Sequence, residues 1–115
     1  MTTNNDCLFC SFATGEGGTE IIGENEHAVA FRDINPQAPL HVLVIPRQHY
    51  SDVATLASQN PAALSALIAL ANKIAAQEAD GQYRLIFNSG PQAGQSVFHV
   101  HGHVIGGTKL GWNPA

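Results

Sequence analysis

Short apolar segments, separated by polar or glycine-containing turns, run through most of the 115-residue chain. Several are rich in the β-branched and aromatic residues that favour strands. The most apolar segment, 40–46, is apolar on both faces, as expected of a central strand, and it ends at Pro46, which cannot donate to a sheet ladder. The pattern predicts an antiparallel sheet of about five strands, at residues 20–24, 27–31, 40–46, 83–88 and 95–105.

One longer segment has the periodicity of an amphipathic helix. Asn60 suits the N-cap, Pro61 suits the first helical position, and Gly81 suits the end. The apolar positions that form one stripe are Leu64, Leu67, Ile68, Ala71, Ile74 and Ala75. We therefore expect an α+β fold in which one long helix packs on the sheet, within a single domain covering residues 1–115.

The segment 95–105 carries three of the six histidines. A strand alternates its faces with a period of two, so one face would present three imidazoles about 7 Å apart. That face is predicted to hold Val97, His99, His101, His103 and Ile105. The opposite face, predicted to lie against the core, would hold Phe98, Val100, Gly102 and Val104.

Three interpretations of this histidine row follow from the residues alone. A histidine on a strand is commonly a solvated or hydrogen-bonded side chain, although burying several imidazoles requires a partner for each. The His-x-His spacing is also common among metal ligands. A third interpretation is nucleophilic catalysis by one imidazole, with its two neighbours binding charge.

Charge and hydropathy narrow the class of partner. The net charge is −4 with only five Lys and Arg, which disfavours binding to a nucleic-acid polymer. A small anion remains possible, because backbone N–H groups in the glycine-containing loop 89–94 can bind it. The start is polar, and the apolar run 62–71 is too short to span a bilayer. We expect a cytoplasmic protein that does not bind membranes.

Both cysteines lie in the sequence Cys7-Leu8-Phe9-Cys10. In a reducing compartment this spacing indicates metal binding or redox chemistry before a structural disulfide. Half of a zinc site needs two further ligands, and His49 and His99 are candidates. The alternatives are two buried thiols that pack as small apolar groups, or a thioredoxin-like motif, which the surrounding pattern disfavours.

The segment 99–105 resembles the His-x-His-x-His-x-x signature of the histidine triad (HIT) nucleotide-binding hydrolases. The flanking residues 94–97 and 106–107 strengthen the resemblance, and Trp112 is similar to the tail of the Hint branch of that family. The resemblance extends from Cys7 to Trp112. It departs at Gly102, where the family usually carries a larger apolar residue, and at 17–18, where an Ile-Pro pair is common. It also departs at 113–115.

The resemblance implies a HIT-like fold with a short N-terminal helix. It also implies a homodimer in which Trp112 reaches toward the partner's site. The implied activity is hydrolysis at the α-phosphorus of purine nucleoside phosphoramidates through a nucleotidyl-histidine intermediate. Two alternatives within enzymes are dinucleoside polyphosphate hydrolysis and nucleotidyl transfer. An alternative of another class is a zinc-containing nucleotide-binding or scaffold protein without significant turnover.

The resemblance also assigns roles to residues. His101 would be the nucleophile, with His103, Ser96 and Asn88 completing the catalytic set. The residues implied in nucleotide binding are Phe9, Phe31, Asp33, Ile34, Asn88, Gly94, Gln95, Ser96, Val97, His101 and His103. Asp33 would bind the ribose hydroxyls, although from sequence it is equally a turn residue before Pro36. A structural zinc ion would be held by Cys7, Cys10, His49 and His99, and His41 would lie near the triad.

Overall fold

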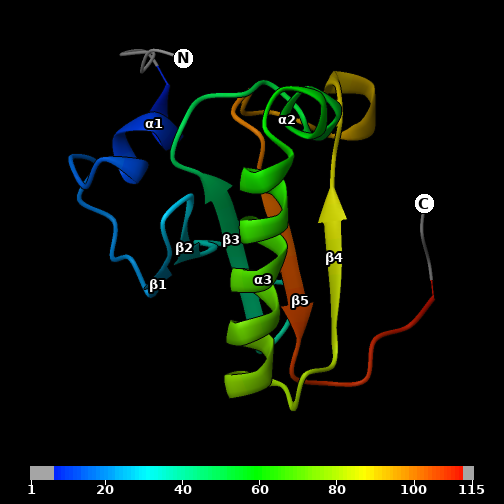
Figure 1. The fold of residues 1–115 in the computed structure, drawn as a ribbon. Coiled ribbons are helices and arrows are strands. Elements are labelled where there is room, and N and C mark those ends of the chain that lie inside the picture. The colour runs from blue at the N-terminus through cyan, green and yellow to red at the C-terminus, as the bar shows by residue number, and fades with distance from the viewer. Residues whose placement is uncertain (1–6, 113–115) are drawn as a thin grey trace.

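The computed structural model describes residues 7–112 and forms a five-stranded antiparallel sheet with helices, as predicted (Figure 1). The polar start and residues 113–115 lie outside the described residues. The spatial order of the strands is β1-β2-β3-β5-β4, so β3 and β5 lie together at the centre. Their bounds are β1 Gly23–Glu24, β2 Ala28–Arg32, β3 Leu40–Pro46, β4 Tyr83–Phe87 and β5 Gly102–Gly106.

The helices lie on both sides of this sheet. The long helix α3 (Pro61–Glu78) crosses one face, in front of β3 and β5 in Figure 1. It begins as predicted, because the Asn60 side chain accepts a hydrogen bond from the Ala63 N–H and Pro61 occupies the first position. The remaining elements are α1 (Leu8–Ala13), α2 (Val53–Gln59) and the short 3₁₀ helix η1 (Pro91–Ala93). Within residues 7–112, no helix is long and apolar enough to cross a membrane.

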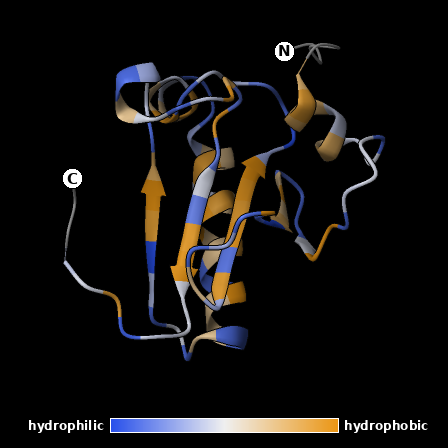
Figure 2. Ribbon diagram, turned by 180° about the vertical axis from the view of Figure 1, so that it is seen from behind, coloured by the Kyte–Doolittle hydropathy of each residue, from blue (hydrophilic) through white to orange (hydrophobic). Residues whose placement is uncertain are grey.

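The two faces of the sheet support two separate apolar clusters. On β3, alternate side chains turn toward α3, and these are Leu40, Val42 and Val44. The intervening Leu43 and Ile45 pack instead with residues of α1. His41 and His103 interrupt this second face, and Figure 2, which views the sheet from behind, shows hydrophilic positions within β3 and β5. The polar site is therefore built on the face opposite α3.

The histidine segment is the main correction to the predicted elements. β5 begins at Gly102, where pairing with both β3 and β4 starts, and not at residue 95. The preceding backbone follows the loop after β3, because the Val100 N–H donates to the Tyr50 carbonyl at 2.8 Å. His99 and His101 thus lie before the strand and are both buried. The alternation expected from 95 to 105 holds only in β5 itself.

Smaller corrections concern burial and length. Phe98, predicted to face the core, is 49% exposed because it precedes the strand. Ile68, assigned to the buried stripe of α3, is 41% exposed, whereas Leu70 is buried in its place. β1 covers two residues and not five, although the Ile22 N–H still donates to the Ala30 carbonyl. α2 was not predicted, because Leu56 is its one buried residue and its apolar periodicity is weak.

Gly102 lies where its neighbours already fill the core. A Cβ atom added there would lie 2.9 Å from Leu85 Cδ1 and 3.1 Å from the Phe87 ring. Both neighbours come from β4, in which Phe87 is the register partner of Gly102. Bulky neighbours therefore occupy the space that the family's usual larger residue would fill.

Candidate active site and metal centre

A cavity of about 300 Å³ opens between α1 and the face of the sheet that carries the histidines. Most of its lining is apolar, and its polar groups include two imidazoles and one carboxylate. The lining residues are Leu8, Phe9, Phe12, Thr19, Phe31, Arg32, Asp33, Ile34, Leu43, Ser96, Val97, His101 and His103. An apolar pocket with a few convergent polar groups is the usual form of a small-ligand site.

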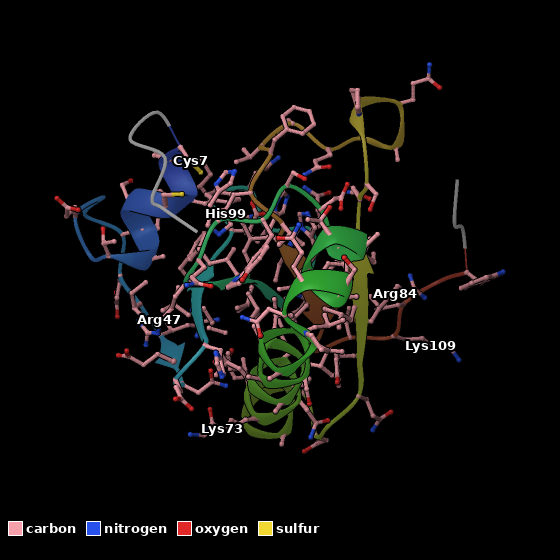
Figure 3. The ribbon with its side chains drawn as sticks, turned by 45° about the horizontal axis from the view of Figure 1, so that its top comes forward. Cys7, Arg47, Lys73, Arg84, His99 and Lys109 are labelled. Atoms are coloured by element: carbon pink, nitrogen blue, oxygen red, sulfur yellow. The ribbon has the colours of Figure 1, made fainter. Side chains whose placement is uncertain are left out.

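A larger cavity of about 610 Å³ lies between the end of α3 and the chain after β5. Its lining includes Glu78, Arg84 and Lys109 but no histidine or cysteine. Figure 3 shows Arg84 and Lys109 far from Cys7 and His99. We therefore place the candidate active site in the smaller cavity, where the titratable groups converge.

The structure brings most of the residues implied in nucleotide binding to this pocket. Phe9 and Phe31 form part of its apolar wall, with ring centroids 5.5 Å apart in an edge-to-face arrangement. Ile34 is 99% exposed, so it stands at the mouth and not in the wall. Sequence reasoning missed Leu8, Phe12 and Leu43. Leu43 was detectable in principle, because it follows His41 by two residues on the same strand face.

Three other implied residues, Asn88, Gly94 and Gln95, are absent from the lining of the pocket. Gln95 is buried and braces the loop: its Oε1 accepts from the Gly90 N–H at 2.8 Å, and its Nε2 donates to the Ser51 carbonyl at 2.7 Å. The N–H groups of Gly94 and Gln95 also donate within the loop, to Pro91 and Gly90. The loop is thus internally hydrogen-bonded and presents Ser96 and Val97 to the pocket.

His101 has a defined tautomer. Its Nδ1 lies 2.9 Å from the carbonyl oxygen of His99. A carbonyl only accepts hydrogen bonds, so Nδ1 carries the proton and, in the neutral ring, Nε2 carries the lone pair. The ring is buried and meets the edge of Phe9 at 5.0 Å and 88°. A buried imidazole with an unprotonated Nε2 on a pocket is a candidate nucleophile or base.

His41 and His103 form a directed chain of hydrogen bonds. The Gln37 N–H donates to His41 Nδ1 at 2.9 Å, so the proton of His41 is on Nε2. That Nε2 lies 3.0 Å from His103 Nδ1, to which it donates. In the neutral ring of His103 the proton is then on Nε2. A backbone N–H before β3 thus determines which nitrogen of His103 is a donor, a contact that sequence reasoning did not find.

Asp33 forms the predicted turn and also approaches two histidines. Its Oδ1 accepts from the Asn35 N–H at 2.8 Å, which is the turn expected before Pro36. Its Oδ2 lies 3.4 Å from His41 Nε2 and 3.9 Å from His103 Nδ1. Burial is the main cause that lowers the pKa of His103, followed by repulsion from His101 and His41, whereas the Asp33 carboxylate acts in the opposite direction.

The ligand atoms of Asp33, His41 and His103 lie within 4.8 Å of one another, as a metal site requires. The hydrogen-bond directions disfavour a metal there. His41 Nδ1 already accepts from Gln37, so a metal on Nε2 would require a doubly deprotonated imidazole. The group is better described as a hydrogen-bond relay. His101 and His103, which line the pocket, and His41, which donates to His103, are together called the pocket histidines below.

Cys7, Cys10, His49 and His99 form a second group, called the thiol–imidazole cluster, whose ligand atoms lie within 4.8 Å of one another. Cys10 Sγ lies 3.2 Å from His49 Nδ1 and 3.3 Å from His99 Nδ1, and Cys7 Sγ lies 3.5 Å from His99 Nδ1. Figure 3 shows Cys7 at the start of α1, near His99. The structure thus brings together all four ligands suggested by sequence.

The chemistry of the thiol–imidazole cluster fits a tetrahedral metal ion. Ligands at ordinary Zn–S and Zn–N distances would place sulfur and nitrogen about 3.5 Å apart, close to the separations observed. His99 Nε2 donates to the Pro46 carbonyl at 2.9 Å, which leaves its Nδ1 lone pair directed at the thiols. Burial lowers the pKa of His99 to about 4, so its ring is neutral at pH 7, as a metal ligand must be.

Trp112, implied in a partner's site, does not line the pocket of its own chain. Its side chain is 83% exposed, and the Arg84 guanidinium lies 5.8 Å from its ring centroid. Arg84 also donates to the Gly111 carbonyl at 2.8 Å, which holds the chain just before Trp112 against the edge strand β4.

Comparison with known proteins gives a consistent result. A protein-family model described as HIT domain matches residues 14–110. A purine nucleoside phosphoramidase of Escherichia coli is 39% identical over 108 residues, covering 92% of this chain and 91% of that protein. An uncharacterised HIT-like protein of Synechococcus elongatus is 38% identical over 112 residues, covering 96% of this chain and 98% of that protein.

Solved structures agree in fold. A HIT family hydrolase from Legionella pneumophila superposes with a TM-score of 0.89 at 38% identity, covering 96% of this chain and 100% of that one. A HIT family hydrolase from Clostridium thermocellum has a TM-score of 0.89 at 41% identity, covering 96% of this chain and 98% of that one.

Proposed function

The chain belongs to the HIT domain family, and we propose that it hydrolyses purine nucleoside phosphoramidates at the α-phosphorus through a nucleotide bound covalently to His101. The observation that carries this proposal is the His101 Nδ1–H···O=C bond to His99, which leaves Nε2 unprotonated beside the pocket. A neutral imidazole attacks an anionic phosphate without bringing a second negative charge to it.

In the first step, His101 Nε2 forms a bond to phosphorus while the bond from phosphorus to the leaving nitrogen breaks. His103 is neutral because burial lowers its pKa, and its Nε2–H is available to a phosphate oxygen or to the leaving group. The Ser96 hydroxyl, which lines the same pocket, is a second donor for the phosphate. Asn88, which directly follows β4 at the start of the loop that leads to Ser96, is assigned to the catalytic set from the family resemblance.

In the second step, water attacks phosphorus and the bond to His101 breaks. The nucleotide keeps the hydroxyl of that water, and over the two steps the departing amine gains the proton. The Nδ1–H bond to the His99 carbonyl stabilises the imidazolium form of His101 while it is bonded to phosphorus. Each histidine finishes in its starting tautomer.

The rest of the pocket suits a nucleoside. Phe9, Phe31 and Ile34 offer an apolar slot and mouth for the purine. The Asp33 carboxylate lines the same pocket, with Oδ1 held by the Asn35 N–H and Oδ2 3.9 Å from His103 Nδ1, and it would accept hydrogen bonds from the ribose hydroxyls. Gly94, Gln95 and Val97 are proposed to contribute to nucleotide binding as parts of the loop that follows η1.

The thiol–imidazole cluster is proposed to bind one structural zinc ion per chain. Two thiolates and two imidazoles are a ligand set that zinc favours, and the four donors leave no open position for substrate. Zinc there would join α1 to the segments that follow β3 and precede β5. The hydrolysis itself is carried by the pocket histidines.

A homodimer is proposed in which β4 pairs with its copy in the partner. β4 is an edge strand of the described sheet, and all five of its side chains are partly buried in the single chain. The exposed Trp112 lies beside that edge, where it would reach the partner's site. Light scattering on the purified protein tests this: twice the 12.2 kDa mass of the chain is expected, and a monomer would contradict it.

The activity is tested by incubating the protein with adenosine and guanosine phosphoramidates and, separately, with a diadenosine polyphosphate. We expect release of the nucleoside monophosphate and the amine, and no release by His101→Ala. Faster cleavage of the polyphosphate would favour that alternative substrate class. Tight nucleotide binding without turnover in a single-turnover assay would favour a binding or scaffold role.

A further inference from the structure

The helix α1 serves the pocket and the thiol–imidazole cluster at once. Its six residues are too few to form a stable helix without tertiary contacts. Three of its side chains, Leu8, Phe9 and Phe12, line the nucleotide pocket. Cys7 is its N-cap, with the Cys10 N–H donating to Cys7 Sγ at 3.3 Å. Phe9 lies between the two cysteines in sequence, so the wall of the pocket and the cluster share one backbone segment.

The other two ligands attach this helix to the sheet. His49 follows β3, and His99 precedes β5. Cys10 is buried against both imidazoles. The apolar contacts of α1 with β2 and β3 come from Phe9, Phe12 and Ala13, and the Phe12 and Phe31 ring centroids lie 5.0 Å apart. A metal in the cluster would therefore add direct ligation to a short helix that is otherwise held by a few apolar side chains and Cys10.

His99 extends the same connection to the nucleophile. Its ring is fixed at both nitrogens, by the Pro46 carbonyl and by the cysteine thiols. Its backbone carbonyl accepts the proton of His101 Nδ1 at 2.9 Å. Phe9 packs against the His101 ring, with the two ring centroids 5.0 Å apart. The cluster thus positions both the wall of the pocket and the imidazole facing it.

We propose that metal occupancy of the thiol–imidazole cluster sets the affinity of the pocket for nucleotide, by holding α1 so that Phe9 closes the base slot. The inference rests on the proposed function, since it takes a purine nucleotide as the ligand. Loss of the metal releases Cys7 and Cys10, opens the wall formed by α1, and weakens nucleotide binding.

The test measures AMP affinity by titration calorimetry with zinc-loaded and zinc-free protein, each prepared from wild type and from Phe9→Ala. In wild type, removal of zinc is expected to weaken AMP binding by about tenfold or more, within the usual range of coupling between sites. In Phe9→Ala the loaded protein binds AMP more weakly, and removal of zinc then changes the affinity by less than about threefold. Amide hydrogen exchange in α1 is expected to accelerate on zinc removal.

Leu67→Ala is the matched control. Leu67 is a fully buried residue of α3 on the opposite face of the sheet. The variant loses stability through a core cavity and is expected to keep both its zinc and its AMP affinity. This separates the effect of the metal from a general loss of stability.

Equal AMP affinity of loaded and zinc-free wild type would overturn the inference while leaving the proposed function intact. An equal effect of zinc in Phe9→Ala would also overturn it. Failure of the loaded protein to bind AMP at all would overturn both. If circular dichroism shows the zinc-free protein unfolded, Cys7→Ser replaces it, because three ligands remain: a folded variant with unchanged AMP affinity then overturns the inference.

Discussion

The thiol–imidazole cluster and the pocket histidines contain two imidazoles, His99 and His101, that are only two residues apart in sequence but leave opposite ring nitrogens unprotonated. In the cluster, His99 Nε2 donates to the Pro46 carbonyl, so the lone pair on Nδ1 faces the thiols. In the pocket, His101 Nδ1 donates to the His99 carbonyl, so the lone pair on Nε2 faces the cavity. The comparison shows that the backbone carbonyl each ring meets selects which nitrogen remains available, and hence whether the ring suits a metal or a phosphate.

The largest expected effect is a loss of turnover, which should distinguish the role of His101 from that of His99. His101→Ala should lower kcat by about 10⁴-fold or more, as loss of a nucleophile does, while AMP binding stays within about tenfold. His99→Ala should instead lose the metal. Single-turnover kinetics and elemental analysis on both variants measure the difference. Retained zinc in His99→Ala, or turnover in His101→Ala, would remove the division of roles.

Removing a thiol tests the cluster alone. Cys10→Ser should release the metal, because Cys10 Sγ contacts both imidazoles, and should lower Tm by about 10 °C or more. The loss of stability should exceed the loss in the rate of the chemical step at saturating substrate. Metal content by mass spectrometry and a thermal melt provide the check. Metal-replete wild-type protein that contains no zinc would refute the zinc assignment.

Asp33→Asn tests whether this pocket carboxylate binds the ribose. The substitution keeps the Asn35 turn but removes the charged acceptor, so affinity for AMP should fall by ~1.5–3 kcal/mol. A 2′,3′-dideoxy nucleotide is the matched control and should bind about equally to both proteins. Should AMP affinity stay unchanged, Asp33 is a turn residue and has no role toward the ribose.

Gly102→Leu tests the packing behind the histidines. Its side chain would enter space already occupied by Leu85 and Phe87, so the free energy of unfolding should fall by ~1–3 kcal/mol. Gly102→Ala should cost less, because its single Cβ meets only the ends of the Leu85 and Phe87 side chains. Denaturant melts compare the two variants. A higher Tm for the leucine variant would mean that the core tolerates the larger residue.

The smallest effect concerns pH. Burial lowers the pKa of His103 below its ordinary value of 6.5, so the folded protein binds fewer protons there than the unfolded chain. The stability from this difference is present above pH 6.5 and is lost as pH falls from 6.5 through the lower folded pKa. Wild type should lose stability over that window by less than about 1.4 kcal/mol per pH unit from this group. His103→Gln should show a shallower acid slope in urea melts, and an identical slope would contradict this cause.

Local pattern predicted the elements that local chemistry controls. β3 has the predicted bounds, and α3 begins at Asn60 and Pro61 because capping depends on adjacent residues. The predicted strand from residue 95 was wrong over its first seven residues, because alternating apolar residues do not reveal that Val100 bonds to Tyr50. Phe98 was misplaced for the same reason. Such pairings depend on where a distant loop passes.

The candidate site also has parts that the sequence predicted and parts that it did not. Residue chemistry suggested Cys7, Cys10, His49 and His99 as metal ligands, and the family resemblance implied the same set, which the structure brings together. The tautomers were not predictable, because they depend on the Gln37 N–H and on the carbonyls of Pro46 and His99. Backbone groups are present at every position, so a sequence does not show which of them meets an imidazole.

Whether His101 is the nucleophile is tested most directly by rapid-quench peptide mapping after the protein is mixed with a labelled adenosine phosphoramidate. His101 is the pocket histidine whose Nδ1–H is held by a backbone carbonyl, which leaves its Nε2 free to attack phosphorus. We therefore predict a transient adenylate on the peptide that contains residues 99–103, assigned to His101 by fragmentation and absent from His101→Ala. Label on His99 or His103 would contradict the account.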